Sequence, residues 1–168
     1  MNSFQRFLRD RGFRKAFPGR KFVRGAVTEV GHMVAESIKI SVVDDDESMR
    51  KAIKTLVELV GIRVEGFSSA EEFLRSHSNN DSACLILDVR MPGISGFELQ
   101  NLLTRIKNPV PIIFITAHYS EEERARAIEA GAIEYLQKPF SEKVLFNAIR
   151  LALVNESSSS CDTLDQDQ

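Results

Sequence analysis

Between residues 38 and 154 the chain alternates short apolar segments with segments of helical periodicity. The apolar segments, which predict strands, are residues 38–43, 62–67, 83–88, 111–116 and 132–137. The helical pattern fills residues 46–60, 69–77, 95–106, 120–130 and 141–154. Five strand–helix units in succession can bury both kinds of apolar face when a parallel sheet is covered by helices. The sequence therefore predicts an α/β fold around a five-stranded parallel sheet.

The boundaries of these helices carry the expected residue types. Serines that suit helix N-termini occur at Ser68 or Ser69, Ser120 and Ser141, with Glu71 or Glu72 and Glu123 three residues on in the first two cases. Glycines stand where helices should stop, at Gly61 and Gly131. These signals agree with the helix positions inferred from periodicity.

The composition of the strands predicts their order in the sheet. ACLIL before Asp88 and PIIFIT up to Thr116 are nearly continuous apolar runs, typical of strands buried on both faces. GIRVEGF and AIEYLQ alternate apolar and polar residues, as edge strands do. The order 2-1-3-4-5 of a flavodoxin-like (βα)5 fold satisfies both patterns, and it predicts a ligand site beyond the carboxyl ends of the first and third strands.

Length and composition set further limits. A chain of 168 residues with 43% hydrophobic content has room for one ordinary domain with extensions. Its uncharged apolar runs are far shorter than the roughly 20 residues of a membrane-spanning helix. Cys84 and Cys161, with His32, His77 and His118 scattered, offer no disulfide framework and no zinc-ligand spacing. We expect a cytoplasmic protein that does not bind membranes.

Both ends of the chain differ from its centre. Residues 1–37 contain eight Lys/Arg and three acids, whereas residues 38–168 contain fourteen and twenty-one. We interpret residues 1–35 as a basic extension that is disordered or non-native, with Met33 as an alternative start of the protein. The alternative interpretation is an arm that binds nucleic acid or anionic membranes. Residues 155–168 are predicted to be a disordered polar tail, and residues 36–154 the folded domain.

Polar side chains stand at the ends of the predicted strands. Asp44 and Asp45 follow the first strand, Asp88 and Thr116 close the third and fourth, and Lys138 follows the fifth. Because parallel strands end at the same edge of a sheet, these side chains should converge. Each residue alone is common at strand ends and helix N-caps, and Asp46 is interpreted as an N-cap. Together, however, the carboxylates are hard oxygen ligands that need a counter-ion, and Mg²⁺ suits them.

Four motifs, VVDDDES, LILDVRMPGISGFEL, FITAH and YLQKPF, resemble in order and spacing those of the receiver domain of two-component response regulators. The resemblance covers residues 36–154. It implies that a sensor histidine kinase transfers a phosphoryl group to Asp88 in a phosphorelay, and that the protein is not otherwise an enzyme. It also implies that Mg²⁺ is held by Asp44, Asp45, Asp88 and the backbone carbonyl of Arg90.

The resemblance implies further roles. Thr116 and Lys138 would contact the phosphoryl oxygens, and Tyr135 would be an aromatic switch that turns inward on activation. Arg90 and His118 would tune dephosphorylation. A downstream protein target or a homodimer would use the fourth helix, the fifth strand and the fifth helix, and no direct binding of nucleic acid is expected from residues 36–154.

Other functions stay open at this stage. The motifs resemble most those of FixJ-type transcription regulators, so the chain is either a receiver fragment of such a DNA-binding regulator or, as we favour, a stand-alone receiver. An aspartate-nucleophile, Mg²⁺-dependent phosphatase is another alternative, although Arg90 occupies the position where its second aspartate is expected. A flavin carrier is disfavoured because the DDDES loop would repel the cofactor phosphate.

Overall fold

The computed structural model describes residues 38–76, 81–108 and 110–155. Its elements, in chain order, are β1 (Lys39–Val43), α4 (Glu47–Glu58), β2 (Arg63–Phe67), α5 (Ala70–Arg75), β3 (Cys84–Asp88), α7 (Gly96–Arg105), β4 (Ile112–Thr116), α8 (Glu121–Glu129), β5 (Glu134–Gln137) and α9 (Glu142–Asn155). Every predicted strand and helix is present within two residues of its expected limits. The predicted tail begins at the last residue of α9, and the rest of it, like the extension 1–35, lies outside the described residues.

The five strands form one parallel sheet in the order β2-β1-β3-β4-β5, which confirms the predicted topology. β3 and β4 are buried at every position. The outer strand β2 is buried only at Val64 and Phe67, whereas Arg63, Glu65 and Gly66 are exposed. The continuous apolar runs therefore correctly predict β3 and β4 as inner strands, and the alternating pattern correctly predicts β2 as an edge strand.

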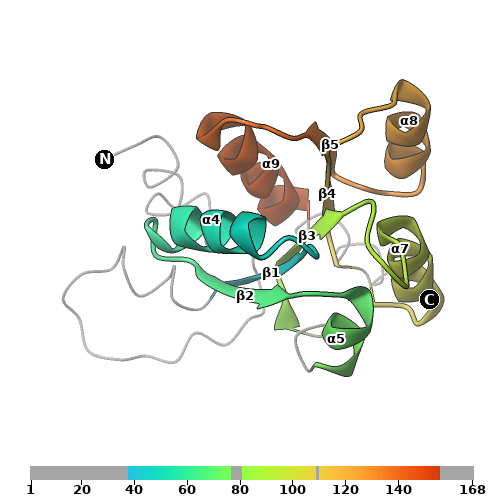
Figure 1. The fold of residues 1–168 in the computed structure, drawn as a ribbon, viewed down its shortest axis with the longest axis horizontal. Helices are drawn as coiled ribbons and strands as arrows, with labels where there is room; N and C mark the ends of the chain where they lie inside the picture. The colour runs from blue at the N-terminus through green and yellow to red at the C-terminus, as the bar shows by residue number, and fades with distance from the viewer. Residues whose placement is uncertain (1–37, 77–80, 109, 156–168) are drawn as a thin grey trace, which may run out of the picture.

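Helices cover both faces of the sheet (Figure 1). On one face, α4 and α9 bury residues such as Ile53, Val57 and Ile149 against Ile40 and Ile86. On the other face, α5, α7 and α8 pack against the strand side chains that alternate with those of the first face. This second cluster includes Phe73, Leu99 and Ala127 from the helices and Leu85 and Phe114 from the strands. Each fully buried Ile, Leu or Phe stabilises the fold by about 1.5–3 kcal/mol. These two apolar layers hold the strand ends in register.

Local signals fix the helix boundaries as expected. The Asp46 carboxylate accepts a hydrogen bond from the Ser48 amide at the start of α4, and Ser69 and Ser120 cap α5 and α8. Gly61 and Gly131 follow α4 and α8 with positive φ angles of 86° and 92°, which glycine adopts without a Cβ clash. The N-caps therefore fix where the loops from the carboxyl edge of the sheet end, and the two glycines fix where the loops at the opposite edge begin.

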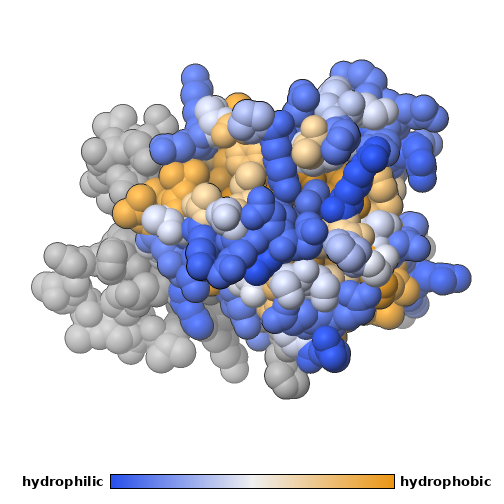
Figure 2. Space-filling view, viewed as in Figure 1, coloured by the Kyte–Doolittle hydropathy of each residue, from blue (hydrophilic) through white to orange (hydrophobic). Residues whose placement is uncertain are grey.

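The surface is mainly hydrophilic, with apolar side chains gathered over α4 and α9 (Figure 2). The exposed apolar residues on and beside these two helices are Leu59, Val144, Leu151 and Val154. Within the described ranges, no helix combines the length and the apolar character needed to cross a membrane.

Candidate functional site

The predicted site residues converge at the carboxyl edge of the sheet. Asp44 directly follows β1, and Asp88 ends β3, the strand that pairs with β1 at the point where the strand order reverses. Thr116 ends β4, the next strand along. Lys138 follows β5. The sheet topology therefore brings together side chains separated by up to 94 residues of sequence.

One lysine joins two of the carboxylates. Lys138 Nζ lies 2.7 Å from Asp44 Oδ2 and 3.2 Å from Asp88 Oδ2. The three side chains are well buried, with 13% of Lys138, none of Asp44 and 10% of Asp88 exposed. Charge-assisted hydrogen bonds of this kind are about twice as strong as neutral ones. The lysine thus neutralises part of the negative charge and points the Asp88 carboxylate into the site.

The electrostatics of the site follow from this burial. Desolvation raises the pKa of Asp88 above its ordinary value, and the attraction of Lys138 opposes this increase without cancelling it; the neighbouring charge of Asp44 adds to the increase. For Lys138, burial alone would lower the pKa, but its hydrogen bond to Asp44 and the charges of Asp88 and Asp44 raise it. The lysine is therefore held as a fixed cation beside a carboxylate that is costly to keep charged.

The same carboxylates fit a divalent cation. One oxygen atom from each of Asp44, Asp45 and Asp88 lies within 4.8 Å of the others, and Asp45 is exposed to solvent while Asp44 and Asp88 are buried. Hard oxygen ligands with one side open to water are the arrangement that Mg²⁺ accepts, because it retains part of its hydration shell. The donor set therefore fits Mg²⁺.

The loop that carries the acidic residues is fixed by its own hydrogen bonds. Asp44 Oδ1 accepts from the Asp46 amide at 2.8 Å, and the Arg50 guanidinium donates to the Asp44 carbonyl oxygen at 2.6 Å. Arg50 lies on the first turns of α4, six residues after Asp44. The arginine thus ties the acidic loop to the start of the helix, a role that the sequence analysis did not assign.

Thr116 is fully buried at the end of β4. Its hydroxyl accepts from the His118 amide at 3.1 Å and lies 3.2 Å from the His118 carbonyl oxygen, to which it can donate. The His118 side chain is exposed. The Lys138 amide donates to the Thr116 carbonyl oxygen at 2.7 Å, and the bond between Lys138 and Pro139 is cis. The threonine and the lysine therefore belong to one hydrogen-bonded corner of the site.

Arg90 and Tyr135 meet at a residue that the sequence analysis treated only as part of a helix start. The Glu123 carboxylate of α8 accepts from the Tyr135 hydroxyl at 2.8 Å and from the Arg90 guanidinium at 3.2 Å. Tyr135 is 3% exposed, and the centroid of its ring lies 6.1 Å from that of Phe114. Burial, the hydrogen bond to Glu123 and its charge raise the pKa of Tyr135. The tyrosine side chain thus already points inward in this structure.

The loop between β3 and α7 approaches the site closely. The Arg90 amide lies 3.4 Å from Asp88 Oδ1, and the Gly96 amide donates to the Val89 carbonyl oxygen at 3.0 Å. From α5, Glu71 accepts from the Ile94 amide at 3.1 Å. This last contact, between residues 23 positions apart, has no signal in the sequence. Pro92, Gly93 and Gly96 are residue types typical of such a tight loop.

Comparison with known proteins agrees with this fold and site. Residues 40–150 match the family model described as the response regulator receiver domain. The chain is 41% identical over 137 residues to the response regulator protein TodT of Pseudomonas putida, covering 82% of this chain and 59% of TodT. It is 36% identical over 118 residues to the transcriptional regulatory protein FixJ of Azorhizobium caulinodans, covering 70% of this chain and 56% of FixJ.

A solved structure gives the same result. The response regulator StyR superposes with a TM-score of 0.65 at 46% sequence identity, over 70% of this chain and 59% of the StyR chain. The chain belongs to the response regulator receiver domain family, and its likeness to FixJ confirms the FixJ-type comparison made from the motifs. It spans between half and two thirds of the length of TodT and FixJ.

Proposed function

We propose that Asp88 is the phosphoacceptor of this receiver domain and that a sensor histidine kinase is the donor. One observation carries the proposal: the Asp88 carboxylate lies 3.2 Å from Lys138 Nζ, within a cluster of three carboxylates at the strand-order reversal. In the transfer, an Asp88 oxygen forms a bond to phosphorus while the bond from phosphorus to the kinase histidine nitrogen breaks. The histidine keeps the electron pair of that bond.

The surrounding residues supply what this reaction requires. Phosphoryl transfer needs positive charge and hydrogen-bond donors at the equatorial oxygens of the transferring group. Lys138 is a buried cation that already contacts Asp88, and the Thr116 hydroxyl is a donor at the end of the adjacent strand. Asp44, Asp45, Asp88 and the Arg90 carbonyl would hold Mg²⁺, which supplies further charge neutralisation.

The rest of the proposal concerns the consequences of phosphorylation. The domain acts as a cytoplasmic switch rather than as an enzyme with a substrate turnover of its own, and Arg90 and His118 tune the loss of phosphate. Its output surface comprises α8, β5 and α9. Thr116, at the end of β4, and Tyr135, on β5, flank the region that rearranges on phosphorylation. A protein target or a second copy of the chain binds there.

The experiment is chemical phosphorylation followed by intact mass measurement. With acetyl phosphate and Mg²⁺, the wild type should gain one phosphoryl group and Asp88→Asn none. Asp46→Asn is the matched control, because it removes a neighbouring charge but leaves a residue that still caps α4; it should be modified like the wild type. Equal modification of Asp88→Asn and the wild type would refute the assignment.

A second candidate concerns the output. The relatives TodT and FixJ are longer than the matched region, and FixJ is named as a transcriptional regulatory protein. This favours the alternative that the chain is the receiver part of a DNA-binding regulator over the stand-alone reading. The test is the oligomeric state: addition of beryllofluoride should produce a dimer detectable by light scattering, whereas a stand-alone receiver that binds a different protein should stay monomeric.

A further inference from the structure

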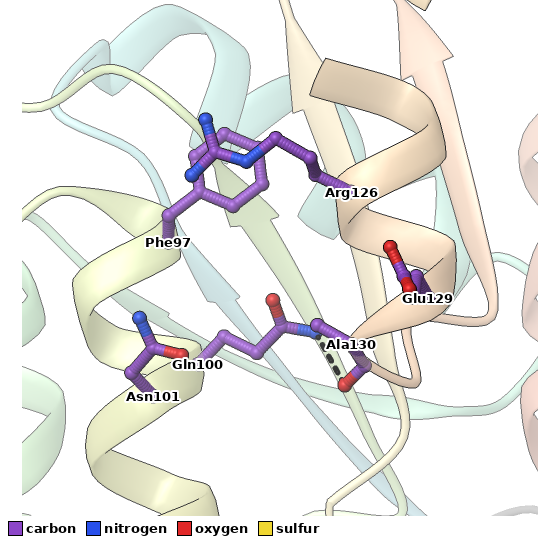
Figure 3. Close-up of a pocket in the computed structure, with 6 residues that line it drawn as sticks. All are labelled: Phe97, Gln100, Asn101, Arg126, Glu129 and Ala130. Carbon is purple, nitrogen blue, oxygen red and sulfur yellow. Dashed lines mark hydrogen bonds between the residues drawn. The ribbon is translucent and has the colours of Figure 1, made fainter. Parts of the chain in front are cut away.

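Helix α8 is attached to the rest of the domain by few apolar contacts. Of its nine residues, Ala127 is the buried one, and an alanine contributes little apolar area. At its C-terminal end, Arg126 lies over the Phe97 ring at 5.5 Å and Gln100 donates to the Ala130 carbonyl oxygen at 3.2 Å (Figure 3). A cavity of about 280 Å³ lies beside these contacts, between α7 and α8. Polar contacts therefore determine much of the position of α8.

At the N-terminal end of α8 the polar contact is Glu123. Its side chain is 24% exposed and bridges two parts of the domain, since Oε1 pairs with Arg90 and Oε2 accepts from Tyr135. Arg90 belongs to the loop directly after Asp88, and its amide is 3.4 Å from the Asp88 carboxylate. One carboxylate thus connects the loop beside the phosphoacceptor to both α8 and β5.

A phosphoryl group on Asp88 would compete with Glu123 for the Arg90 guanidinium. The group brings a charge of about −2 and several acceptor oxygens, and a guanidinium binds phosphate and carboxylate oxygens with the same donor geometry. The Arg90 side chain is 59% exposed and is therefore free of the packing that would prevent it from changing partner. Arg90 is two residues from Asp88 in the chain and is ion-paired with Glu123, so both anions would compete for one exposed cation.

We propose that Glu123 is a positioning residue that holds the Arg90 guanidinium on α8 while Asp88 is unmodified, and that Arg90 exchanges Glu123 for the phosphoryl oxygens when Asp88 is modified. The exchange removes the link between the Asp88 loop and the start of α8, while Tyr135 remains bonded to Glu123. This inference rests on the proposed function, because it requires a phosphoryl group on Asp88.

The test is a double-mutant cycle on beryllofluoride affinity, measured by calorimetry in the presence of Mg²⁺. Glu123→Gln removes the competing anion, so beryllofluoride should bind about two- to fivefold more tightly, the range expected for a partly exposed ion pair. Arg90→Gln should weaken binding. In the Arg90→Gln background, Glu123→Gln should have no further effect. Glu122→Gln is the matched control, since it removes the same charge from an exposed neighbour and should leave affinity unchanged.

The outcomes separate the two proposals. If wild type does not bind beryllofluoride, the proposed function falls and this inference with it. If wild type binds but Glu123→Gln leaves affinity unchanged, or tightens it equally in the Arg90→Gln background, only the inference is overturned, because a long-range charge effect would persist without Arg90. The ring resonances of Tyr135 provide a second readout; they should shift in Glu123→Gln and remain in place in Glu122→Gln.

Discussion

Replacing Gly96 with alanine should disturb the site through the backbone of Asp88. Gly96 is the first residue of α7 and is buried. A Cβ at this position would overlap the Asp88 carbonyl oxygen and lie 3.1 Å from both the Asp88 carbonyl carbon and Phe114 Cε1. Overpacking of this kind costs about 1–3 kcal/mol, and the upper end applies because a backbone carbonyl cannot rotate away as a side chain can. Alanine recovers at most about 1 kcal/mol as the better helix former.

The net expectation is a loss of about 2 kcal/mol in the free energy of unfolding, or roughly 8 °C in Tm for a domain of this size. Urea denaturation measures it, and calorimetry should show weaker beryllofluoride binding because Asp88 moves. Gly66→Ala is the control: its Cβ would lie 3.8 Å from the Arg50 side chain, an ordinary contact, so stability should stay the same or rise slightly. Wild-type stability and affinity in Gly96→Ala would refute the reasoning.

Three further predictions concern the charged cluster. Mg²⁺ at about 100 times its Kd should stabilise the wild type by about 2.7 kcal/mol, and thermal denaturation of Asp45→Ala should show a smaller gain. Lys138→Met should lose about 3–5 kcal/mol in metal-free buffer because it leaves buried carboxylates without a cation, and Mg²⁺ should raise its Tm more than that of the wild type. The pKa of Asp88 is raised above its ordinary value of 3.8, so protonation of this carboxyl stabilises the folded state at low pH. That stabilisation is lost as the pH rises from 3.8 through the raised pKa. Asp88→Asn removes this loss, so without metal it should be more stable than wild type at pH 7 in urea denaturation; a less stable variant would contradict the pKa argument.

The strand order is the part of the fold that the residue pattern determines most directly. Side chains alternate between the two faces of a strand, so a strand buried on both faces must be apolar at successive positions, as in CLILD and IIFIT. An edge strand such as RVEGF can expose alternate residues. The positions of Asp88 and Thr116 follow from the same logic, because each is the residue at which an apolar run stops.

The contacts of the site depend instead on packing between distant segments. The pattern predicts that Lys138 and Asp44 lie at the same edge, but the distance of 2.7 Å between them depends on where the loops after β5 and β1 settle. The acidic residues alone do not indicate the bond from Arg50 to the Asp44 carbonyl oxygen. For Tyr135, neighbouring residues do not determine whether the ring points in or out.

Glu123 shows this division within one residue. Its place three residues after Ser120, at the start of a periodic segment, predicts a position in the first turn of a helix, and the Ser120 hydroxyl does accept from its amide. That much is local, since it depends on the backbone geometry of four consecutive residues. The partners of its carboxylate are 33 and 12 residues away in the chain, on the Asp88 loop and on β5. They meet only when α8 packs on the sheet, because a side chain several ångströms long selects its partner from whatever the tertiary structure brings within reach.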